Sequence, residues 1–104
     1  MESERKMSSS MTEDIKAELQ MRLVEQKQLE EEAVRIEAFM ETIRRNIAAL
    51  ELMSSSARNA RGERDRYATM SPQEELAHYE QELDDVRQRI EALQAAIDLL
   101  ERQL

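Results

Sequence analysis

Several residue types that most folded domains use are scarce in this chain. It contains no cysteine, no tryptophan, one phenylalanine and two tyrosines among 104 residues, with one glycine (Gly62) and one proline (Pro72). Without cysteine the chain can form no disulfide framework, which fits an intracellular protein. Sheets, sandwiches and barrels need turn residues and large rings, so this composition argues against them.

Long hydrophobic runs are also missing. No segment approaches the roughly 18 consecutive apolar residues of a membrane span, and the N-terminal residues lack the apolar region of a signal peptide. We therefore expect a soluble intracellular protein of the cytoplasm or nucleus, with no membrane span.

The charge that is present is mostly acidic. Charged residues make up 37% of the chain and hydrophobic residues 40%, and the formal net charge is −8. This balance is typical of long helices with a narrow apolar stripe. Nucleic-acid binding through the helices is not expected, because phosphate contact needs a basic stripe that these segments lack.

The second half of the chain carries an unbroken apolar pattern. From residue 76 onward, apolar side chains alternate at spacings of three and four, which is the a/d seam of a coiled-coil helix. We expect this helix over 71–104. Its seam residues are Leu76, Tyr79, Leu83, Val86, Ile90, Leu93, Ile97, Leu100 and Leu104.

The first half carries a matching pattern, and we expect its helix over 11–53. Its apolar seam residues are Ile15, Leu19, Leu29, Ala33, Ile36, Met40, Ile43, Ile47 and Leu50. Two polar residues, Arg22 and Gln26, interrupt this seam. Buried polar residues at such positions can fix register or oligomeric state. Alternatively, they lie where the seam opens at the free end of the hairpin, which is the interpretation we favour.

Capping signals set the expected start of the first helix. Residues 1–10 are polar and end in three serines, so we expect a disordered leader. Ser10 followed by Glu13 has the spacing of a capping box. The segment 54–70 loses the heptad pattern and is rich in serine and arginine, and we expect a flexible connector there.

The second helix has the strongest start signal. Ser71 suits the N-cap, Pro72 the first helical position, and Glu74 the third. The Ser-Pro pair is also a possible proline-directed phosphorylation site, although a plain N-cap explains the same residues without modification.

Two helices with matched seams most simply form an antiparallel coiled-coil hairpin of the all-α class. With Leu50 and Leu76 both beside the connector, Leu104 reaches back to about Arg22, and residues 13–21 overhang. Six of the apolar residues off the seam are candidates to face a partner: Leu23, Val24, Phe39, Leu52, Met53 and Leu99. They either thicken the intramolecular contact or are harmlessly exposed, or they complete a helical bundle with a second copy or a partner, which is the interpretation we favour.

Catalytic and metal-binding patterns are not evident. His78 lies beside the seam, where a solvated histidine is expected rather than a general base. The acidic runs 30–32 and 84–85 lack the alternating oxygen ligands of a calcium loop. We expect no enzyme activity, catalytic residue, cofactor, metal or small-molecule substrate.

In architecture, the two seams resemble the helical hairpins of prefoldin-type chaperone subunits and the coiled-coil subunits of tethering, trafficking and kinetochore complexes. Prefoldin subunits place β-hairpins between their helices, whereas 54–70 contains one β-branched residue, Thr69. The resemblance transfers no residues. The sequence therefore predicts a non-catalytic structural or adaptor subunit that binds protein partners or itself through helices. The alternative is a prefoldin-like or holdase-type chaperone, or a small regulatory protein that binds a client through apolar helix faces.

Overall fold

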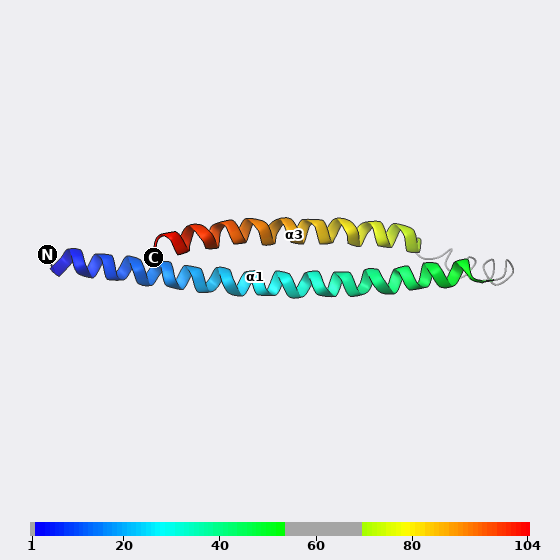
Figure 1. Cartoon of the computed structure of the whole chain (residues 1–104), viewed down its shortest axis with the longest axis horizontal. Coiled ribbons are helices and arrows are strands. Elements are labelled where there is room, and N and C mark those ends of the chain that lie inside the picture. Colours follow the sequence, from blue (N-terminus) through cyan, green and yellow to red (C-terminus); the bar gives the residue numbers. More distant parts are fainter. Residues whose placement is uncertain (1, 54–69) are drawn as a thin grey trace. The chain divides into compact units, whose positions relative to one another are not determined.

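The computed structural model describes residues 2–53 and 70–104, and the regular secondary structure in these ranges is entirely α-helical. Helix α1 spans Glu2–Glu51 and helix α3 spans Pro72–Arg102. The two helices pack side by side in opposite directions (Figure 1). The predicted all-α class and helical hairpin are thus confirmed for the described residues, whereas completion of a bundle by a second chain stays a prediction.

The start of α1 differs from the sequence expectation. The helix begins at Glu2, so Ser10 lies inside it rather than at its N-cap, and residues 2–10 are helical rather than a disordered leader. Each serine costs only about 0.5 kcal/mol relative to alanine in a helix. Extending an existing helix adds one hydrogen bond per residue, while starting a new one is the costly step. The serine run therefore weakens the helix without ending it.

The ends of the helices facing the predicted connector are clearly marked. The amide of Leu52 donates to the carbonyls of Ala48 and Ala49, and the amide of Met53 donates to Leu50, so α1 closes in a tightened last turn. The predicted connector, 54–70, lies outside the described residues apart from Met70.

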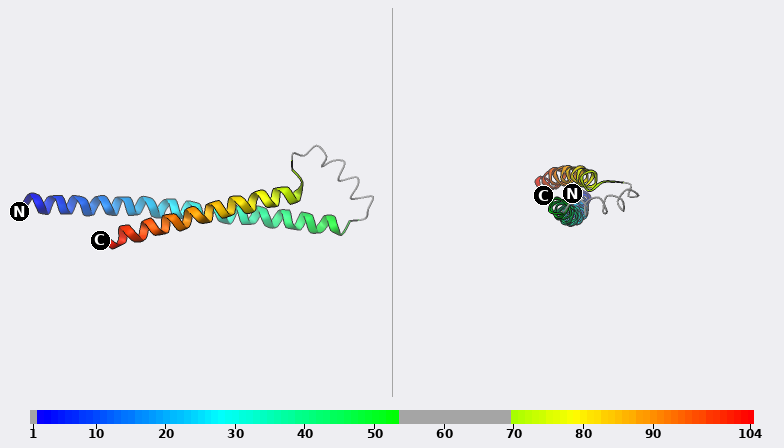
Figure 2. Two further views of the ribbon diagram at one scale, coloured as in Figure 1. Left: turned by 90° about the horizontal axis from the view of Figure 1, so that it is seen from above. Right: turned by 90° about the vertical axis from the view of Figure 1, so that its right-hand side faces the viewer.

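The packing divides into two compact units. Unit 1 combines α1 up to Glu32 with Val86–Leu104, and unit 2 comprises Ala33–Asp85. In each unit a segment of α1 lies against a segment of α3, as two further views also show (Figure 2). Both units bury apolar residues along the seam between the helices.

The register in unit 1 differs from the one expected. The expected register, with Leu50 near Leu76, implies that Gln26 faces Leu100. In the structure the Gln26 side chain instead donates to Gln94 Oε1 at 2.7 Å, six residues earlier in α3. In unit 2, Phe39 stacks on Tyr79, whereas the expected register places it opposite Arg87, so the register again differs by about one heptad.

A heptad shift is easily missed because it returns apolar residues to apolar partners. Only the polar residues distinguish the two registers, and the observed one gives Gln26 a hydrogen-bonding partner. Ile15 and Leu19 are consequently half-buried, whereas the sequence register left them overhanging. Gln26 therefore does not lie in an opened seam.

Candidate functional site

The structure places nearly all predicted seam residues between the helices. Among the described side chains, the buried hydrophobic residues are Ile36, Met40, Ile43, Leu83, Val86 and Ile97. All six are seam positions. The other seam residues are half-buried, except Leu104, which is 56% exposed after the end of α3.

The off-seam residues proposed to face a partner have a different environment. Leu23, Val24, Phe39, Leu52 and Leu99 are all exposed, whereas Met53 is half-buried. The structure adds further exposed apolar residues that the sequence analysis did not select: Met11, Met21, Val34 and Met70. Met11, Met21 and Val34 lie in α1 but off its heptad seam, so the heptad pattern itself could have indicated that they are exposed.

Three aromatic rings meet on one side of unit 2. Phe39 of α1 stacks on Tyr79 of α3, with ring centroids 5.8 Å apart and an interplanar angle of 19°. His78 meets Tyr79 edge-on at 5.6 Å. The His78 ring also lies 3.0 Å from the Glu82 carboxylate, one helical turn away. His78 is thus exposed beside the seam, as expected, but takes part in an aromatic cluster.

This cluster borders a groove of about 380 Å³, which we call the Phe39 groove. From α1 it is lined by Phe39, Thr42, Ile43 and Asn46. From the α3 side it is lined by Met70, Glu75, His78 and Tyr79. The Thr42 hydroxyl is already used, since it donates to the Ala38 carbonyl at 3.1 Å. The groove thus combines the apolar side chains of Phe39, Ile43, Met70 and Tyr79 with the polar groups of Asn46, Glu75 and His78.

The two walls of the Phe39 groove differ in charge. On α1, Phe39, Thr42, Asn46 and Ala49 follow one another at helical spacings of three and four, and none is charged. On α3, the corresponding stripe is Glu75, His78, Glu82 and Asp85. Residues 71–86 contain six acidic side chains and no lysine or arginine. One wall is therefore neutral and the other acidic.

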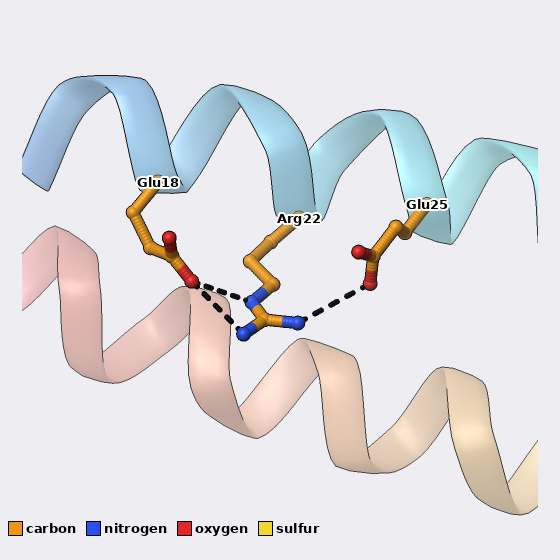
Figure 3. Close-up of polar contacts among 3 residues, drawn as sticks. All are labelled: Glu18, Arg22 and Glu25. Atoms are coloured by element: carbon orange, nitrogen blue, oxygen red, sulfur yellow. Dashed lines mark hydrogen bonds and ion pairs between the residues drawn. The ribbon is translucent and has the colours of Figure 1, made fainter.

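Unit 1 contains the polar part of the seam. Arg22 forms ion pairs within α1, with Glu18 at 2.9 Å and with Glu25 at 3.3 Å (Figure 3). Because all three side chains are substantially exposed, these pairs contribute little to stability. They nevertheless satisfy a guanidinium group at a seam position.

A hydrogen-bonded chain lies beside this ion pair. Gln26 donates to Gln94, and Gln94 donates in turn to Asp98 Oδ1 at 2.9 Å. The sequence analysis missed Gln94, because it lies one residue past the seam position Leu93. A polar residue at the seam was the available signal that a polar partner should be sought opposite.

The N-terminus of α3 is capped as its sequence suggests. Ser71 Oγ accepts a hydrogen bond from the Glu74 amide at 3.1 Å, and the Ser71 carbonyl accepts one from the Glu75 amide at 2.9 Å. This is N-cap geometry. Phosphorylation of Ser71 stays a prediction.

The described residues contain no group of three or more His, Asp or Glu side chains placed to hold a metal ion. Neither described helix includes a stretch long and apolar enough to cross a bilayer. No family model, curated protein or solved structure matches the chain. Its function is therefore argued from its own residues.

Proposed function

We propose that this chain is a non-catalytic structural or adaptor subunit that assembles with protein partners through its helices. The observation that carries the proposal is the Phe39 groove with its exposed aromatic ring. Phe39 is 55% exposed even though it stacks on Tyr79. The intramolecular contact therefore leaves part of an apolar face uncovered.

The energetic argument follows from what the hairpin leaves in water. The helices bury their seams against each other, so folding already uses most of the heptad pattern. Leu52 and Leu99 remain 88% and 57% exposed. Single exposed apolar residues are common, but a groove that brings the exposed side chains of Phe39 and Met70 together is typical of an interaction site.

The proposal is tested by isolating the affinity-tagged full chain from its source cells after mild crosslinking. A structural subunit is expected to be recovered with the same protein at a fixed molar ratio, measured by native mass spectrometry. The purified pair should also show more helical circular dichroism than the sum of its components. Recovery of the chain with no protein at a reproducible ratio would contradict the proposal.

Exposed methionines favour the alternative, a holdase-type chaperone. Met11, Met21 and Met70 are exposed, and flexible methionine side chains suit surfaces that bind varied clients. A holdase is expected to suppress aggregation of unrelated unfolded proteins, such as reduced insulin, at near-equimolar amounts. The adaptor proposal predicts no suppression beyond that of a control protein of similar charge.

A further inference from the structure

We infer that the Phe39 groove docks an amphipathic helix of a partner protein, one that carries lysine or arginine beside its apolar stripe. The inference rests on the proposed function and specifies its site and the chemistry of the partner. Three features of unit 2 support it: the apolar side chains at the base of the groove, the helical spacing of the lining residues and the charge of the residues at its edge.

The floor of the groove can accept apolar side chains. Ile43 is buried, while Phe39 and Met70 are exposed, and Tyr79 is held by stacking on Phe39. A volume of about 380 Å³ lies near the lower end of the roughly 300–1,000 Å³ of small-molecule sites. A few large side chains fit this space, which favours short anchors from a longer element lying over the groove.

The shape of the lining favours a helix as that element. Phe39, Thr42, Ile43 and Asn46 follow the i, i+3, i+4, i+7 spacing of one helix face. Such rows form the ridges and grooves through which helices pack on one another. A third helix laid between α1 and α3 would place its own anchors at the same spacing, as in helix-in-groove recognition.

The charge of the rim selects the partner. Glu75 lines the groove, and Glu82 and Asp85 continue the same stripe of α3. Arg35 lies one turn before Phe39 on the α1 stripe, but it does not line the groove. Within unit 2, these two stripes thus carry three carboxylates and one guanidinium group. A helix with basic residues beside its apolar stripe complements it.

The same charges disfavour a second copy of this chain as the occupant. Two copies joined through this face would place two acidic stripes in one interface, and like charges in an interface are costly. The whole chain carries a formal net charge of −8, so long-range repulsion acts in the same direction.

Binding is tested with the full chain and a pair of synthetic helical peptides. The basic probe is a labelled peptide of about 18 residues, long enough to form helix, with leucines at i, i+3, i+4, i+7 and lysines flanking them. The matched probe replaces every lysine with glutamate. Fluorescence anisotropy at about 0.15 M salt is expected to show at least tenfold tighter binding of the basic peptide. Equal affinities would overturn the inference.

Matched substitutions locate the site. Glu75→Lys is expected to weaken binding of the basic peptide about tenfold, whereas Glu80→Lys, on the same helix but away from the groove, should change it less than about threefold. Phe39→Ala is expected to weaken binding about tenfold, with Val34→Ala as the exposed apolar control. Circular dichroism verifies that each variant is folded. Equal effects of a groove variant and its control would place the peptide elsewhere and overturn the inference.

Two results separate failure of the inference from failure of the proposed function. If the double variant Phe39→Ala/Glu75→Lys still recovers the cellular partner at the wild-type ratio, the groove assignment is wrong and the adaptor function stands. If neither form recovers a partner at a fixed ratio, the proposed function fails and the inference fails with it. A dimer in analytical ultracentrifugation that Phe39→Ala converts to monomer would instead assign the groove to self-association and overturn the inference.

Discussion

Replacing the most buried side chain tests whether the seam holds the hairpin together. Ile97 is 1% exposed, whereas Leu99, two residues away on α3, is 57% exposed. Substitution by alanine removes three carbon atoms from each residue, so the two variants differ mainly in burial. At about 0.8 kcal/mol per buried CH₂, Ile97→Ala loses about 2.4 kcal/mol of transfer free energy. The cavity left behind raises the expected cost to about 3 kcal/mol.

The control variant has a smaller expected effect. Less than half of the Leu99 side chain is removed from water, so Leu99→Ala should lower the free energy of unfolding by less than about 1 kcal/mol. A small helical core supplies only a few kcal/mol in total. Ile97→Ala is therefore expected to be largely unfolded, whereas Ile97→Val, with an expected loss of about 0.5–1.5 kcal/mol, gives a measurable intermediate.

Urea denaturation followed by far-UV circular dichroism measures these differences. The expected order of stability is wild type, Leu99→Ala, Ile97→Val and Ile97→Ala, with the dependence on urea unchanged if the exposed surface is the same. Equal losses for Ile97→Ala and Leu99→Ala would refute the reasoning, because they would show that the two positions are equally buried in solution.

Three further substitutions test individual contacts. Ser71→Ala should lower the free energy of unfolding by about 1 kcal/mol, while Ser71→Asp should retain the N-cap, as measured by urea denaturation; equal stability of all three forms would contradict the cap. Gln26→Leu should broaden the distance distribution between spin labels on the two helices, because the polar contact with Gln94 no longer distinguishes heptad registers; an unchanged distribution would contradict this role. Arg22→Met should change stability by less than about 1 kcal/mol and reduce its salt dependence, since the lost ion pairs are exposed; a larger loss would show that the pairs are structural.

The seam was predictable from sequence because burial repeats with the helix period. Ile36 and Val86 are apolar at heptad spacing, and both are buried. The register was not predictable in the same way, because a shift of one heptad preserves apolar matching. The contact between Gln26 and Gln94 distinguishes the registers, and only the structure shows the two side chains opposite each other.

The Phe39 groove was only partly predictable. Phe39 stands out as an apolar residue beside the seam, and Glu75 belongs to an acidic first turn. Their placement along one groove depends on the register of α1 against α3, which the sequence pattern leaves open. Local propensity at the serine run did not predict the start of α1, because extending an existing helix through these residues costs little.

The most direct test of the account is a map of carboxylate-to-lysine coupling between the full chain and its cellular partner. Every lysine of this chain precedes residue 33, so unit 2 has no lysine of its own that could couple to Glu75 or Glu82. A zero-length coupling product that joins either glutamate to a lysine of another protein therefore reports that the partner lies at the groove. The account predicts one partner at fixed ratio, with coupling products at these two residues. Products scattered over many proteins, or one fixed-ratio partner coupled only outside the groove, would contradict it.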